Sequence, residues 1–81
     1  MSKIELYDPA GGFYWGKVKD DGKIDLFDQG GRYWHGKMKP DGKIDMWDQN
    51  GAYYFGKVKE NGSVDLFDQN GNPQWHGKVK E

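Results

Sequence analysis

Residues 23–42 read KIDLFDQGGRYWHGKMKPDG, and residues 43–62 read KIDMWDQNGAYYFGKVKENG, which is identical at about half of its positions. The same pattern precedes and follows these stretches, so that the chain is one domain, residues 1–81, built from a tandem repeat. The four units span residues 3–22, 23–42, 43–62 and 63–81. Only the last unit carries an insertion, near Pro73. A repeat of this length buries its apolar face against neighbouring repeats.

Each unit alternates apolar and polar residues with a period of two, as a strand with one buried face does. No segment has the periodicity of a helix. Within a unit, the connections Asp-x-x-Gly and Asp/Asn-Gly both suit a three-residue hairpin loop, a type I turn followed by glycine in the left-handed region. Each unit is therefore predicted to be one β-hairpin.

The loop length fixes which side chains share a face, because a slip of one residue moves every side chain to the other face. With a loop at residues 9–11, Leu6 lies opposite Tyr14. With a loop at residues 20–22, Val18 lies opposite Ile24. A two-residue turn at Asp21-Gly22 would mix the two faces, and we reject it.

This register sorts the side chains into a core face and an aromatic-rich face. The predicted core face comprises Ile4, Leu6, Tyr14, Val18, Ile24, Leu26, Trp34, Met38, Ile44, Met46, Tyr54, Val58, Val64, Leu66, Trp75 and Val79. The aromatic-rich face carries Tyr7, Phe13, Trp15, Phe27, Tyr33, His35, Trp47, Tyr53, Phe55, Phe67 and His76, with Gln74 in one equivalent position. Between the rings we expect charged pairs such as Lys17 with Asp25 and Lys37 with Asp45.

The fold class is predicted to be all-β, with eight short antiparallel strands in a meander of four hairpins. A solenoid of stacked coils would place Lys17, Lys37, Lys57 and Lys78 in one ladder, where like charges repel. Eight strands are enough to close a barrel filled by side chains. The alternative is an open curved sheet that pairs in an oligomer. Because core burial alone looks insufficient for so short a chain, we expect part of the aromatic-rich face to be buried too.

Composition excludes several function classes. The formal net charge is −1, so no net positive field attracts nucleic acid or an anionic membrane. The chain has no cysteine, no apolar run long enough to span a bilayer and no apolar signal region after Met1. The cytoplasm is therefore the default expectation, without a positive signal for any compartment.

Catalytic chemistry has no distinct motif in this sequence. No Ser-His-Asp set, phosphate-binding glycine loop or isolated carboxylate pair stands apart from the repeat. His35 and His76 occupy equivalent positions and could form a metal or titrating pair, but we favour a packing role. The aspartates Asp8, Asp28, Asp48 and Asp68 are predicted to cap turns rather than to act in catalysis. The runs at residues 20–22 and 48–51 are predicted to be turns rather than calcium loops. We expect no enzyme, no cofactor and no metal site.

The eleven aromatic and histidine side chains of the second face are the candidate binding residues. Flat rings between charged groups form protein-binding hot spots, and they also stack on sugars. We expect a non-catalytic structural or interaction module that binds a protein partner or its own copies. The alternative is a small multivalent carbohydrate-binding module, with Tyr7, Trp15, Phe27 and Trp47 as stacking platforms.

The runs YDPAG at residues 7–11, FDQGGR at residues 27–32 and PDG at residues 40–42 resemble the YD repeats of bacterial Rhs-type proteins. The resemblance extends through all four units. It implies an array of β-hairpins with a surface or carbohydrate-binding role. Such regular repeats also fit a designed repeat protein without a native function beyond folding.

Overall fold

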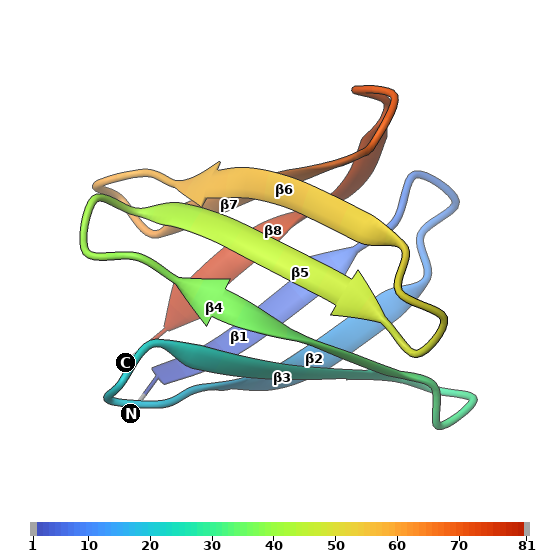
Figure 1. The fold of residues 1–81 in the computed structure, drawn as a ribbon, viewed down its shortest axis with the longest axis horizontal. Helices are drawn as coiled ribbons and strands as arrows, with labels where there is room; N and C mark the ends of the chain where they lie inside the picture. Colours follow the sequence, from blue (N-terminus) through green and yellow to red (C-terminus); the bar gives the residue numbers. More distant parts are fainter. Residues whose placement is uncertain (1, 81) are drawn as a thin grey trace.

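The computed structural model describes residues 2–80, which form eight β-strands and no helix. The strands are β1 (Ser2–Tyr7), β2 (Phe13–Val18), β3 (Lys23–Asp28), β4 (Tyr33–Met38), β5 (Lys43–Asp48), β6 (Tyr53–Val58), β7 (Ser63–Asp68) and β8 (Pro73–Lys80). They follow one another in chain order around a closed barrel, and β8 pairs with β1 (Figure 1). The predicted antiparallel meander is confirmed, and the sheet closes on itself rather than remaining open.

The hairpin register is the predicted one. Leu6 pairs with Tyr14 across the first loop, and Val18 pairs with Ile24 across the second. Each loop closes with a hydrogen bond between its flanking residues; the amide of Lys19, for example, donates to the carbonyl of Lys23 over 2.8 Å. The loop glycines have φ angles of 82–90°, the left-handed conformation that the three-residue loop requires.

The barrel interior contains all sixteen residues of the predicted core face. Twelve of them are buried, and the other four are partly buried against that cluster: Met38, Tyr54, Val58 and Val79. Each unit also contributes one large ring to an interior cluster. Trp75 lies 5.6 Å from Tyr14, 5.5 Å from Trp34 and 4.9 Å from Tyr54 between ring centroids. The first two contacts are edge-to-face, a favourable geometry for aromatic pairs.

A glycine near the middle of every second strand lets neighbouring strands approach closely. Gly16 lies between Ile4 on β1 and Leu26 on β3. A Cβ atom at this position would lie 1.7 Å from the carbonyl oxygen of Asp25, so no other residue fits without backbone movement. Gly36, Gly56 and Gly77 have equivalent environments. Because these glycines have no side chain, the apolar side chains opposite them fill the interior at these positions.

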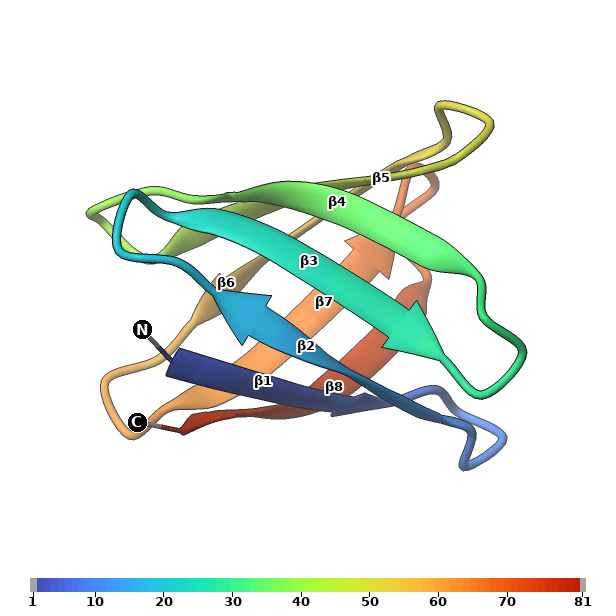
Figure 2. The same cartoon turned by 90° about the horizontal axis from the view of Figure 1, so that it is seen from below.

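The two ends of the barrel differ in chemistry. The loops 19–23, 39–43 and 59–63 lie at the end that also holds both chain termini, and the other four loops lie at the opposite end (Figure 2). All lysines lie in the half near the termini, whereas Asp8, Asp28, Asp48 and Asp68 begin the opposite loops. No helix that could cross a membrane occurs within residues 2–80.

The last hairpin departs from the regular pattern at its insertion. The register between β7 and β8 shifts between Leu66 and Phe67, so that Leu66 pairs with Trp75 and Phe67 pairs with Pro73. The extra residue forms a β-bulge that keeps Trp75 in the interior. Opposite Phe67, where the other hairpins carry a ring, this hairpin has Pro73, and Gln74 is the additional residue of the bulge.

Candidate functional site

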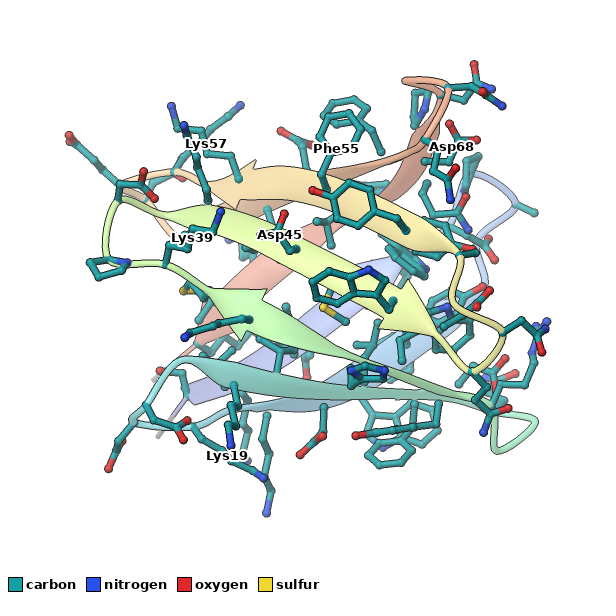
Figure 3. All side chains as sticks on the ribbon, in the orientation of Figure 1. Lys19, Lys39, Asp45, Phe55, Lys57 and Asp68 are labelled. Carbon is teal, nitrogen blue, oxygen red and sulfur yellow. The ribbon has the colours of Figure 1, made fainter. Side chains whose placement is uncertain are left out.

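The eleven predicted binding residues form a ring of side chains around the outside of the barrel, which we call the aromatic belt. The belt comprises Tyr7, Phe13, Trp15, Phe27, Tyr33, His35, Trp47, Tyr53, Phe55, Phe67 and His76, and each of these rings contacts another belt ring. Figure 3 shows one member, Phe55, on the outer surface of β6. The structure thus places all eleven residues on the outer face of the barrel, as the strand register predicted.

The belt consists of two runs of stacked or tilted rings. A run of four passes from His76 through Tyr7 and Phe13 to Trp15. A run of seven begins at Phe27 and ends at Phe67. Between Phe67 and His76 the belt is interrupted because Pro73 and Gln74 stand where the other hairpins carry a ring. Between Trp15 and Phe27 it is interrupted although the two residues pair across β2 and β3.

The rings of the belt cover one another only in part. Trp15 is 41% exposed, and Tyr7, Phe27 and Phe55 are exposed to a similar degree. Phe13, Tyr33, Trp47, Tyr53 and Phe67 are half-buried by their neighbours. Lateral stacking thus provides part of the additional burial that the sequence led us to expect. The belt therefore leaves several large rings exposed on the outside of the barrel, separate from the interior cluster.

Two belt tyrosines are fixed by carboxylates on the next strand. The Tyr33 hydroxyl donates to Asp25 over 2.6 Å, and the Tyr53 hydroxyl donates to Asp45. These hydrogen bonds hold the pKa of both aspartates below the ordinary value, against the opposing effect of burial. They also raise the pKa of Tyr33 and Tyr53. These two hydrogen bonds thus restrain the orientation of the Tyr33 and Tyr53 rings within the belt.

The expected pairing of a lysine with each of these aspartates is confirmed in the strand register, but another lysine makes the ion pair. Lys17 pairs with Asp25 in the strand register, but the ion pair is made by Lys19, whose Nζ lies 3.2 Å from Asp25 Oδ2. Lys39 likewise takes the place of Lys37 beside Asp45, at 3.1 Å (Figure 3). In each case the tyrosine hydroxyl donates to Oδ1 of the aspartate. The lysine two residues after the strand-paired lysine reaches Oδ2 diagonally.

This arrangement leaves pairs of lysines that face each other without a carboxylate. Lys3 pairs with Lys17 across β1 and β2. The next two hairpins contain the equivalent pairs Lys23 with Lys37 and Lys43 with Lys57. None of these six side chains is in an ion pair within residues 2–80, where the lysines that form ion pairs are Lys19, Lys39, Lys59 and Lys80. Like charges in directly opposed positions repel, and a bound anion would relieve that repulsion.

Grooves that are lined by belt rings, lysines and carboxylates lie in three of the four units. The groove of the first unit has a volume of 830 Å³ and is lined by Phe13, Trp15 and Phe27 on its apolar side and by lysines and carboxylates on the other. Equivalent grooves occur in the second unit, with a volume of 530 Å³, and in the fourth, with 510 Å³. In the second and fourth units a histidine replaces Trp15. The first groove is therefore both larger and more apolar.

The loops at the aspartate end are capped as predicted. Oδ1 of Asp8 accepts hydrogen bonds from the amides of Ala10 and Gly12, and its Oδ2 accepts one from the Tyr14 hydroxyl over 2.7 Å. These bonds, the one from Tyr14 foremost, lower the pKa of Asp8. Burial and Asp8 raise the pKa of Tyr14. The indole N–H of Trp75 partly offsets this rise in the pKa of Tyr14, although it makes no hydrogen bond.

The remaining loops of this end repeat the same cap. Asp28, Asp48 and Asp68 each accept from two backbone amides of their own loop. Asp28 also accepts from Arg32 Nε over 2.7 Å, which raises the pKa of Arg32. The Arg32 guanidinium in turn lies over the Trp34 ring, 5.7 Å from its centroid. The four aspartates thus stabilise the loops that they begin.

The two histidines do not meet. His35 lies on β4 and His76 on β8, and three strands separate them in either direction around the barrel. His35 contacts Tyr33 and Trp47, and His76 contacts Tyr7. Within residues 2–80 no group of three or more His, Asp or Glu side chains is placed to hold a metal ion. Both histidines are members of the belt by geometry.

Comparison with known proteins gives no relative: no family model, no curated protein and no solved structure matches the chain. The fold and the outer surface are therefore the basis for assigning a function.

Sequence reasoning missed the grooves and the unpaired lysines. The signal for the lysines was present, because three of the four units begin with lysine and each carries another directly after its mid-strand glycine. The unequal grooves had only a partial signal, the histidine that replaces Trp15 in the second and fourth units. The missing contact between Trp15 and Phe27 depends on how the rings pack.

Proposed function

We propose that this protein is a non-catalytic interaction module that binds a protein surface, including that of its own copies, through the aromatic belt. The observation that carries this proposal is the separation of two apolar surfaces. Sixteen side chains fill the interior, and a second set of eleven rings surrounds the outside, with six of them more than a third exposed. A closed barrel has no free strand edge, so association through side chains is the route that remains.

The aromatic belt has the composition of a protein-binding hot spot. Tryptophan and tyrosine are enriched at such sites because they provide a large apolar area and few rotatable bonds. The hydrogen bonds of Tyr33 and Tyr53 to Asp25 and Asp45 reduce the side-chain entropy that binding would otherwise cost.

The test is a variant in which Trp15, Trp47 and Phe55 are replaced by serine. Light scattering should give a mass that rises with concentration for the natural sequence and a constant monomer mass for the variant, with the same far-ultraviolet circular dichroism for both. Loss of the β-sheet spectrum would assign these rings to the fold. An identical mass at every concentration for both proteins would contradict self-association through the belt.

A second candidate function is carbohydrate binding. The observation that favours it is the repetition of the groove, which combines an aromatic or histidine ring with lysines and a carboxylate in three of the four units. Repeated weak sites on one rigid body would bind a repeating polymer with gain from multivalency. Tryptophan fluorescence titrated with a glycan panel tests this candidate, and a flat response to every glycan would contradict it.

A further inference from the structure

The groove of the first unit lies beside a junction between hairpins whose paired rings make no contact, unlike the rings at the three other junctions. At the other junctions between hairpins, the paired rings are in contact. Their centroids lie 6.1 Å apart for His35 and Trp47, 6.0 Å for Phe55 and Phe67, and 6.0 Å for His76 and Tyr7. Trp15 and Phe27 pair in the same register but make no ring contact, and the largest of the equivalent grooves opens beside them.

The side chains in this groove form two rows across β1, β2 and β3. The first row is Glu5, Trp15 and Phe27, and the second is Lys3, Lys17 and Asp25. The rows are two residues apart along the strands, which is about 7 Å. The groove therefore offers a flat apolar surface next to two adjacent ammonium groups, with a carboxylate at each side.

The charges of the groove are unequally compensated. Glu5 binds Lys80 over 2.8 Å, and Asp25 binds Lys19 and Tyr33. Lys3 and Lys17 are exposed and have no carboxylate partner. A ligand that fits must bring an anionic group to the lysines, and near the carboxylates it must bring hydrogen-bond donors.

We propose that this groove binds an acidic sugar, a pyranose ring that carries a carboxylate. The apolar face of the ring would stack on Trp15, because sugar C–H groups pack on the negative face of an indole. The sugar carboxylate would lie between Lys3 and Lys17, and hydroxyl groups would donate to Glu5 and Asp25. This inference rests on the second of the two proposed functions and specifies its ligand.

An acidic peptide fits the groove less well. A closed sheet has no unpaired strand edge, so the backbone of an extended peptide would find no main-chain partners. Its side-chain carboxylates would also approach Glu5 and Asp25, and it would bring few donors to them. A sugar hydroxyl donates where a peptide carboxylate would be repelled.

The test is a titration of the full chain with an oligogalacturonate, followed by tryptophan fluorescence and by chemical-shift perturbation. The matched ligand is the same oligosaccharide with its carboxylates methyl-esterified. We expect the acid to bind at least about tenfold more tightly than the ester, and its affinity to fall as salt concentration rises. The K3Q/K17Q and W15A variants should each weaken binding of the acid by at least about tenfold.

The control variant is K43Q/K57Q, which removes the equivalent lysine pair below the closed junction of Phe55 and Phe67. It should change the affinity by less than about twofold. An equal loss in the control, or shifts spread over all four units, would overturn the assignment to the first groove. Equal binding of acid and ester would overturn the acidic ligand but leave carbohydrate binding intact. Binding of a glutamate-rich peptide or of inorganic sulfate as tightly as the oligogalacturonate would also overturn it.

Discussion

Trp15 and Phe27 lie directly opposite each other on β2 and β3, yet their rings are apart, while the three equivalent ring pairs are in contact. The backbone repeats its register from hairpin to hairpin, and the outer side chains do not repeat their packing. The outer surface thus differs from unit to unit, although it is built from equivalent positions. The open junction coincides with the largest of the equivalent grooves and with an unpaired set of lysines.

The belt and the core should contribute very differently to stability. Trp15→Ala removes a ring that is 41% exposed, and we expect the free energy of unfolding to change by less than about 1 kcal/mol. Trp75→Ala removes a ring that is 2% exposed, at the centre of the interior cluster, and should cost about 3–5 kcal/mol. Urea denaturation of both variants measures the difference, and equal losses would mean that the belt is part of the core.

The mid-strand glycines should tolerate no side chain. Gly36→Ala would place Cβ 1.9 Å from the carbonyl oxygen of Asp45, and we expect a cost of about 3 kcal/mol or more, or failure to fold. Gly30→Ala is the control, because its Cβ would make only an ordinary contact at 3.5 Å with Asp28. The control should stay within about 1 kcal/mol of the natural protein in thermal unfolding. A well-folded Gly36→Ala protein of normal stability would contradict the close strand approach.

The sequence predicted the fold and the membership of both faces because one physical rule governs them. Side chains alternate along a strand, so the position of Leu6 or Trp15 relative to a loop of known length decides its face. The same reasoning could not determine which lysine meets Asp25, since long flexible side chains reach diagonally. It also could not determine the space between Trp15 and Phe27, which depends on ring orientation rather than on strand register.

Each aspartate cap should contribute measurably to the free energy of unfolding. Asp48→Ala removes the acceptor for the amides of Asn50 and Ala52, and we expect a loss of roughly 1–2 kcal/mol. Asp48→Asn keeps a side-chain oxygen and should recover most of that loss. Chemical denaturation provides the measurement. No difference between the alanine and asparagine variants would show that the cap hydrogen bonds contribute nothing.

The tyrosine–aspartate bonds should make stability depend on acid pH. The pKa values of Asp25 and Asp45 are lower in the folded protein than the ordinary 3.8, because Tyr33 and Tyr53 donate to them. The folded state therefore binds fewer protons than the unfolded chain in this range. The contribution of these bonds to the free energy of unfolding should be fully present above pH 3.8. It should be lost as the pH falls through the folded-state pKa values of Asp25 and Asp45.

The Y33F/Y53F variant tests this dependence. Without the hydroxyls both carboxyl pKa values should move up toward 3.8, so the decline in stability with acid becomes shallower. Near neutral pH the variant should lose roughly 0.5–1 kcal/mol per hydrogen bond. Denaturation curves at several pH values below 5 measure both effects. A variant with the same acid slope as the natural protein would contradict the role of these bonds.

The four tryptophans give the most direct test of a belt that is separate from the core. Trp34 and Trp75 lie inside the barrel, and Trp15 and Trp47 lie on the belt. Hydroxyl-radical footprinting read by mass spectrometry should be carried out at two protein concentrations a hundredfold apart. We expect Trp34 and Trp75 to be protected at both, and Trp15 and Trp47 to be oxidised at the low concentration and protected at the high one. Oxidation of Trp34 and Trp75 at the rate of Trp15, or oxidation of the belt tryptophans that does not change with concentration, would contradict an interior core combined with an associating outer belt.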